Sequence, residues 1–147
     1  MKRISSLKSI VTLHGKPHHI AGGFALGSFI GMMPIPGFQM VVSLVLAVLL
    51  RISKKAACIG VFNTNILTGA FIFGFNLWLG KTILGISLNF TMPDKIGFDF
   101  IKLVFSAGAD VFLSMVIGGI ITGIISAVIS YYILINILKR RNSEERK

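Results

Sequence analysis

The sequence predicts an all-α integral membrane protein that is organised around a broken, re-entrant helical hairpin. Hydrophobic residues make up 54% of the 147 residues and charged residues only 14%, whereas soluble domains carry about 25% charged residues. The mean hydropathy is +0.83, and the apolar residues form long blocks, two of which are interrupted. The basic residues gather in short clusters beside these blocks, a pattern that orients membrane segments with the basic side in the cytoplasm.

We expect one membrane domain at residues 16–138, preceded by a basic amphipathic surface helix at 1–15 and followed by a basic cytoplasmic tail at 139–147. In the first segment Ile4 and Leu7 begin an apolar face at helical spacing, among lysines and an arginine. This pattern is typical of a helix lying on a membrane surface. A cleaved signal peptide is the competing interpretation, but the following apolar run is long, Gly- and Pro-broken, and without an evident cleavage site.

The hairpin is predicted at about residues 20–50, where Pro34-Ile-Pro-Gly37 separates two apolar arms. Each arm gives roughly 20 Å of helix, which is short of a bilayer core of about 30 Å. Pro34 and Pro36 lack N–H donors and disfavour helix in the preceding residue, and Gly37 suits a sharp reversal. Both flanks of the hairpin are basic, as two cytoplasmic ends would be. The alternative is a single kinked span, with one basic cluster outside.

A broken membrane helix is predicted at about 56–80, with Asn63-Thr64-Asn65 as its interruption. Lipid cannot satisfy backbone groups that a break frees, so such breaks are tolerated only inside protein or beside water. We therefore expect these polar residues to pair with the opened backbone at Pro34–Gly37, with Gln39, or with a ligand. Ordinary interhelical hydrogen bonds, worth about 0.6 kcal/mol each, are the alternative.

The last third of the chain is predicted to contain an interfacial amphipathic helix at about 95–107 and a transmembrane helix at about 111–138. Residues 81–110 have no basic excess, which favours the non-cytoplasmic side, and both termini are then cytoplasmic. Every fourth residue of one face of the final helix is small, which predicts a packing ridge for another helix of this subunit or for a second subunit in a homo-oligomer. The ridge consists of Ser114, Gly118, Thr122, Ser126 and Ser130.

Several other classes are disfavoured. The net charge of +10 suggests nucleic acid, but the basic residues flank apolar blocks instead of alternating with aromatic residues; we expect anionic lipid headgroups as their partners. His14 and His18 have metal-ligand spacing, but Pro17 lies between them and no carboxylate or thiol is near. No nucleophile–base or carboxylate pair falls in a break. We predict no enzyme, no metal and no cofactor, and Cys58 as a small buried residue.

The motifs Gly23-Phe-Ala-Leu-Gly-Ser-Phe-Ile-Gly31 and Pro34-Ile-Pro-Gly-Phe-Gln39, then Ala47–Arg51, Asn65 and Thr68, resemble the bacterial domain-of-unknown-function family twenty sixty-two. The resemblance covers about residues 16–84. It implies a small multi-pass protein of the bacterial inner membrane, and a glycosyltransferase as one candidate partner, because family members are sometimes joined to such domains. The family usually has Asn-Pro where this chain has Asn65-Ile66.

Two functional interpretations remain open. In the first, the two breaks meet inside the membrane and bind a small polar or phosphate-bearing substrate, since helix N-termini favour anions; the protein is then transporter- or lipid-flippase-like. In the second, it is a non-catalytic anchor or scaffold for a partner such as a glycosyltransferase. The first predicts substrate binding by Pro34, Pro36, Gly37, Gln39, Asn63, Asn65 and Thr68.

Overall fold

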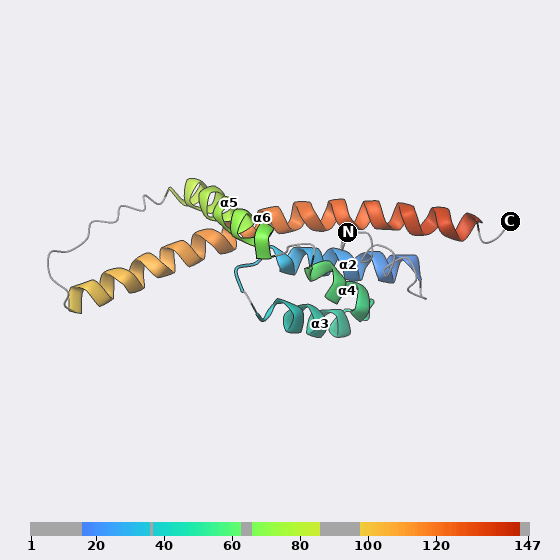
Figure 1. Ribbon diagram of the computed structural model, residues 1–147, viewed down its shortest axis with the longest axis horizontal. Helices are drawn as coiled ribbons and strands as arrows, with labels where there is room; N and C mark the ends of the chain where they lie inside the picture. The colour runs from blue at the N-terminus through green and yellow to red at the C-terminus, as the bar shows by residue number, and fades with distance from the viewer. Residues whose placement is uncertain (1–15, 36, 63–65, 86–97, 145–147) are drawn as a thin grey trace.

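The computed structural model describes residues 16–35, 37–62, 66–85 and 98–144, and this part of the chain contains helices and no strands. The long helix α6 forms the axis of the molecule, and the shorter helices pack along it (Figure 1). The helices are α2 (Pro17–Gly31), α3 (Gln39–Leu49), α4 (Lys54–Val61), α5 (Ile66–Leu84) and α6 (Phe98–Glu144). The surface helix predicted at residues 1–15 lies outside the described residues.

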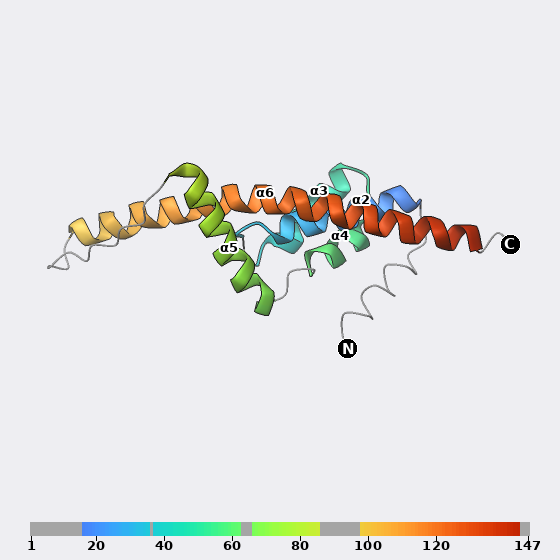
Figure 2. The same ribbon diagram turned by 90° about the horizontal axis from the view of Figure 1, so that it is seen from above.

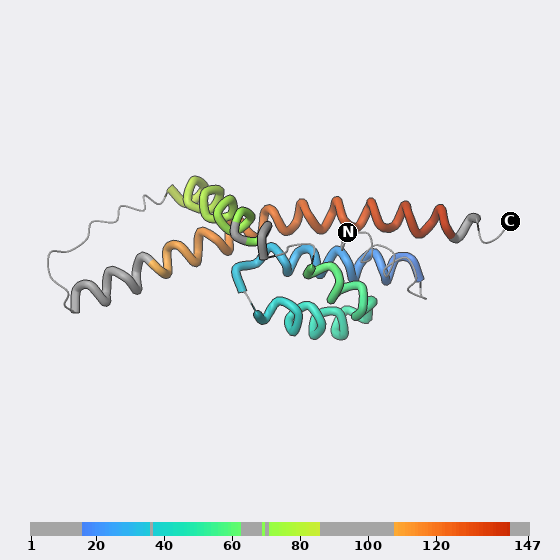
Figure 3. Tube along the Cα trace, viewed as in Figure 1, coloured from blue at the N-terminus to red at the C-terminus, as the bar shows by residue number. Residues whose placement is uncertain are grey.

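The predicted break within residues 20–50 is confirmed. Helix α2 has 15 residues and ends at Gly31, and α3 has 11 residues and begins at Gln39. The chain reverses between them, so that α3 runs back beside α2 (Figures 1 and 3). The single kinked span is therefore wrong, because Pro34 and the residues around it end the helix instead of bending it.

The predicted break within residues 56–80 is also confirmed. Helix α4 ends at Val61 and α5 begins at Ile66, while Asn63 and Asn65 lie outside the described residues. The two halves have different partners: α4 packs against α2, and α5 crosses α6 obliquely (Figure 2). The backbone N–H of Ser53, the N-cap of α4, donates to His19 O at 3.1 Å, which ties the start of α4 to the start of α2.

The prediction of a separate interfacial helix at 95–107 is wrong. The helical backbone runs without interruption from Phe98 to Glu144, over 47 residues. The sequence between the two expected helices contains Gly108 but no proline, and one glycine costs a helix only about 1 kcal/mol relative to alanine. The helix also extends through the first part of the tail expected at 139–147.

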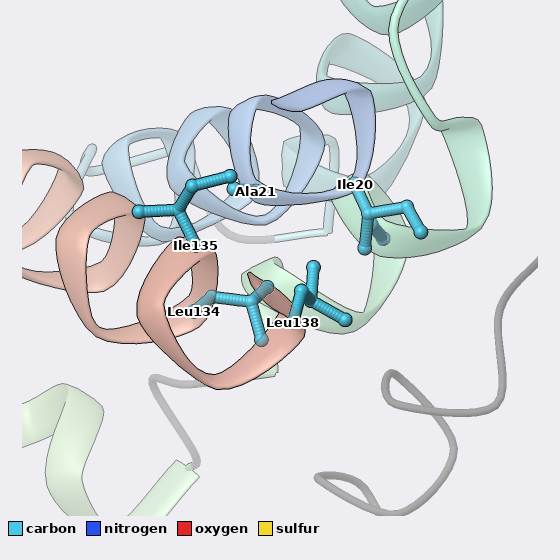
Figure 4. Packing of buried hydrophobic residues seen from close by; sticks show 6 residues of the cluster. Ile20, Ala21, Leu134, Ile135 and Leu138 are labelled. Carbon is cyan, nitrogen blue, oxygen red and sulfur yellow. The ribbon is translucent and has the colours of Figure 1, made fainter. Parts of the chain in front are cut away.

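Close backbone contact joins α2 to α4. A Cβ atom on Gly27 would collide with the carbonyl oxygen of Ala57, and one on Gly60 would collide with the carbonyl oxygen of Phe24. The small-residue face of α2 thus brings α4 near, as such faces do between membrane helices. At the far end of α2, a cluster of buried side chains joins α2, α4 and the last turns of α6 (Figure 4): Ile20, Ala21, Ala56, Leu134, Ile135 and Leu138.

One helix of the described part is long and apolar enough to cross a membrane. It is the stretch Gly108–Arg141 of α6, with 34 residues and a mean hydropathy of 2.3 in its most apolar window. Only 22% of that window is buried, whereas the core helix of a soluble protein would be mostly buried. Its exposed side chains are large and apolar, among them Ile124, Val128 and Ile133.

The contact between α2 and α4 leads to a stability prediction. Gly27→Ala should lower the free energy of unfolding by about 1–3 kcal/mol. The new methyl group would collide with the backbone of α4, so one of the two helices would have to shift. Gly74→Ala is the control, since a Cβ there meets nothing within 4 Å, and it should be neutral or stabilising by about 0.5–1 kcal/mol. Reversible unfolding in mixed micelles measures both. Equal stability of the two variants would contradict the close contact.

Candidate functional site

The end of α2 exposes backbone carbonyls that have no helical donors. A helix leaves its last four C=O groups without intrahelical partners, and here the following segment, with Pro34 buried and Gly37 at a φ of +87°, turns away instead of continuing the ladder. The carbonyls that point out of this end belong to Gly31, Met32 and Met33. Each accepts a hydrogen bond from a side chain that lies elsewhere in the chain.

Gln39 donates to two of these carbonyls, one of which, Met33 O, also accepts from the backbone N–H of Ile35 at 2.9 Å. Its Nε2 donates to Met33 O at 2.8 Å and approaches Gly31 O at 3.4 Å. Because Gln39 is the first residue of α3, its side chain bridges back across the reversal to the helix that precedes it. The Gln39 amide therefore closes the hairpin by donating to carbonyls at the end of α2.

Asn76 satisfies the third carbonyl from the middle of α5. Its side chain is 0% exposed, and its Nδ2 donates to Met32 O at 3.0 Å. Its Oδ1 accepts from the hydroxyl of Thr122 on α6 at 2.8 Å. That hydroxyl also lies 3.0 Å from Gly118 O, so its hydrogen is shared between Asn76 and its own helix. Asn76 thus joins three helices, and we call Met32, Gln39, Asn76 and Thr122 the polar node.

Two adjacent glycines of α6 make room for the polar node. A Cβ on Gly118 would collide with the backbone carbonyl of Asn76, and one on Gly119 would lie 2.9 Å from Met32 O. Farther along the same contact, a Cβ on Gly80 would collide with the backbone carbonyl of Ser114. The predicted small-residue ridge is therefore used by a helix of the same subunit over its first half, from Ser114 to Thr122.

The second half of the ridge lines an open groove. This groove, the α6 groove, has a volume of about 560 Å³ and runs along the α6 face between Thr122 and Ile137. Phe24 of α2, Met32 directly after α2 and Phe75 of α5 form its other walls. Met32 and Thr122 belong both to the groove and to the polar node, so the groove ends beside the buried amide of Asn76.

Two hydroxyls lie along the α6 groove. Ser126 and Ser130 both line it, and Ser130 is 8% exposed. One turn of helix separates them from each other and from Thr122, so the three hydroxyls follow the groove away from the polar node. The lining between them consists of isoleucine, leucine and phenylalanine side chains. The groove is therefore apolar with a few hydroxyls on its floor.

The basic residues converge at the other end of the groove. The start of α2, the start of α4 and the last turns of α6 meet there through the buried cluster around Leu138. The exposed cations of this basic end are Lys16, Arg51, Lys54, Lys55, Lys139 and Arg140. His18 lies among them, and its Nδ1 is 2.8 Å from the Tyr131 hydroxyl. Three basic clusters that are distant in the sequence thus form one cationic surface.

The predicted site residues are only partly brought together. Gln39 lies in the polar node, Pro34 is buried beside it and Gly37 is exposed at the reversal. Pro36, Asn63 and Asn65 lie outside the described residues, as does the side chain of Thr68. Among the described residues no three His, Cys, Asp or Glu side chains group as metal ligands would.

Sequence reasoning missed Asn76, which carries most of the polar node. The available signal was a lone amide within the apolar run Phe71–Leu84, since an amide in such a run needs a partner. It also missed the role of Thr122 as a hydrogen-bond donor, because the spacing of this residue predicts only a place in the small-residue ridge. The pairing of freed backbone with distant amides was expected, but from a different asparagine pair.

These features define a protein whose described part is all-helical, is built on one helix long and apolar enough to cross a membrane, and contains a hairpin closed by side-chain amides. The chain belongs to the DUF2062 family, described as "uncharacterized protein conserved in bacteria", whose model matches residues 4–147. The resemblance noted in the sequence is thereby confirmed and extended over nearly the whole chain. No curated protein and no solved structure matches it.

The polar node predicts coupling between Asn76 and Thr122. In a double-mutant cycle, Asn76→Ala and Thr122→Val should show an interaction free energy of about 0.5–1.5 kcal/mol, since each single change already removes their shared hydrogen bond. The cycle of Asn76→Ala with Thr82→Val is the control, because the Thr82 hydroxyl bonds only within its own helix, to Trp78 O. Unfolding in mixed micelles measures both cycles. Additive effects of Asn76→Ala and Thr122→Val would contradict the node.

Proposed function

We propose that the protein is an integral membrane protein of the bacterial inner membrane, with α2 and α3 as a re-entrant hairpin and the basic end in the cytoplasm. The convergence of three basic clusters at one end supports this topology, because basic flanks are retained on the cytoplasmic side. The position of Lys139 and Arg140 at the same end would make the C-terminus cytoplasmic, and Lys16 would begin α2 there.

The lengths of the helices support a hairpin that enters but does not cross. The 15 residues of α2 extend about 22 Å and the 11 residues of α3 about 16 Å. A hydrocarbon core is about 30 Å thick, so the reversal at Gly37 and the polar node would lie beyond the midplane but short of the far interface. The candidate span Gly108–Arg141, with 34 residues, is longer than the hydrocarbon core is thick, so it can cross the membrane at a tilt.

Within this topology we propose that the protein binds and translocates a phosphate-bearing lipid, as a flippase-like transporter. The observation that carries the proposal is the shared boundary of the α6 groove and the polar node. The groove is open and apolar, which suits a hydrocarbon chain, while Thr122, Ser126 and Ser130 offer hydroxyls to a polar group moving beside it. The cationic surface at the basic end would attract the phosphate.

A non-catalytic scaffold is the second candidate, and one observation favours it. The carbonyls of Gly31, Met32 and Met33 already accept hydrogen bonds from Gln39 and Asn76, so the break is stable without a substrate. The exposed apolar face of α3, with Val41, Leu44 and Val48, would then meet lipid, a second copy, or a membrane-bound partner such as a glycosyltransferase. In this case the break shapes the fold and nothing passes through it.

Lipid scrambling in proteoliposomes separates the two functions. We expect the wild-type protein to speed the transfer of fluorescent phosphatidylglycerol between leaflets, measured by dithionite bleaching, relative to protein-free vesicles. Ser126→Phe should reduce that rate severalfold because the ring fills the groove, whereas Val128→Phe, at a 50% exposed position outside the groove lining, should leave it unchanged.

Transfer no faster than in protein-free vesicles would contradict the translocation proposal. Co-purification with a membrane-bound glycosyltransferase, together with the absence of transfer, would then support the scaffold. Equal rates for Ser126→Phe and the wild type would show that transfer does not use the groove.

A further inference from the structure

We propose that the α6 groove is a binding site for one acyl chain of an anionic phospholipid, whose headgroup lies on the cationic surface of the basic end. The inference rests on the proposed function, and it adds the charge of the bound lipid and its orientation in the groove. It follows from the size of the groove, the chemistry of its two ends and the position of the basic residues beside one of them.

The shape of the groove suits one hydrocarbon chain. It extends about 22 Å along α6, from Thr122 to Ile137, and has a volume of about 560 Å³. Carbon atoms in contact lie about 4 Å apart, whereas a helix with its side chains is about 10–12 Å across. This long and narrow groove therefore suits a single chain of carbon atoms better than the wider helix of a second copy.

The first residues of this chain are also a poor occupant. The segment 1–15 has the length to follow the groove, but Lys2, Arg3 and Lys8 are distributed along it. Placing them between Phe24 and Phe75 would carry charges past apolar walls toward the polar node, and a charge inside the bilayer costs about 2.5–3.5 kcal/mol on insertion scales. A neutral chain has no such cost.

The two ends of the groove set the orientation of the lipid. One end closes at the polar node, where Asn76 is fully buried and already bonded to Met32 and Thr122. The other end is at Ile137, two residues before the exposed Lys139 and three before the exposed Arg140. An anionic headgroup would therefore lie at the open, cationic end, with the methyl end of its chain toward the node.

The test uses tryptophan fluorescence and brominated lipids. In a Trp78→Phe background, which removes the natural tryptophan, a single tryptophan is placed at Ile129 on the groove lining or at Val128, which is next to it in the sequence and outside the lining. The two side chains are 53% and 50% exposed, so they are matched in exposure and depth. The vesicles contain phosphatidylcholine and phosphatidylglycerol in equal parts, with bromine on the chains of one lipid or the other.

We expect brominated phosphatidylglycerol to quench the tryptophan at Ile129 with an apparent preference of about fivefold over brominated phosphatidylcholine, close to the effect of one basic residue at the surface. At Val128 the two brominated lipids should quench about equally. Lys139→Gln with Arg140→Gln should lower the preference at Ile129 while quenching itself persists. Ser130→Leu should reduce quenching at Ile129 by filling the floor of the groove.

Equal quenching by both lipids at Ile129, or the same preference at Val128, would overturn the site. A preference undiminished by the loss of Lys139 and Arg140 would overturn the assigned headgroup position. If neither tryptophan is quenched by either lipid, the protein does not present α6 to a bilayer, and the proposed membrane function fails together with the site. Quenching at both positions without a preference leaves the membrane location intact and refutes only the binding site.

Discussion

The structure depends on the hydrogen bonding of carbonyl groups that α2 frees where it stops. An unpaired backbone group costs several kcal/mol in hydrocarbon, whereas Gln39 and Asn76 supply donors at 2.8 and 3.0 Å. The two amides come from different helices, and Asn76 is itself held by Thr122 of a third helix. The break in the chain is therefore a point of attachment, and removing its partners would loosen the contacts of α2 with both α5 and α6.

Close approach of the backbones is the second requirement, and α6 provides it through small residues. Gly118 and Gly119 let the end of α2 and the middle of α5 reach the same turn of the helix. Beyond Thr122 the small residues continue as Ser126 and Ser130, but no helix of the described part covers them, and they line the α6 groove. The small-residue ridge thus packs against other helices from Ser114 to Thr122 and lines the α6 groove from Thr122 to Ser130.

Much of the fold could be predicted from the sequence because its determinants are local. Pro34, Gly37 and the length of the apolar arms predict a reversal, and the ridge from Ser114 to Ser130 predicts a packing face. The continuous helix from Phe98 was not predictable in the same way, because the amphipathic pattern of residues 95–107 predicts a separate interfacial helix although no residue at its end stops a helix. Asn76 was missed because its role depends on which carbonyls the tertiary structure brings within reach, and spacing along the chain does not contain that information.

In the proposed topology the reversal between α2 and α3 lies within the hydrocarbon of the membrane while the basic end stays in the cytoplasm. A spin label at Phe38, which is 70% exposed beside the reversal, tests it through the accessibility of the label to oxygen and to a water-soluble nickel complex in vesicles. We predict high oxygen and low nickel accessibility at Phe38, with nickel-accessible labels at Lys54 and Lys139 on the same face of the membrane. A nickel-accessible label at Phe38, or labels at Lys54 and Lys139 on opposite faces, would contradict this topology.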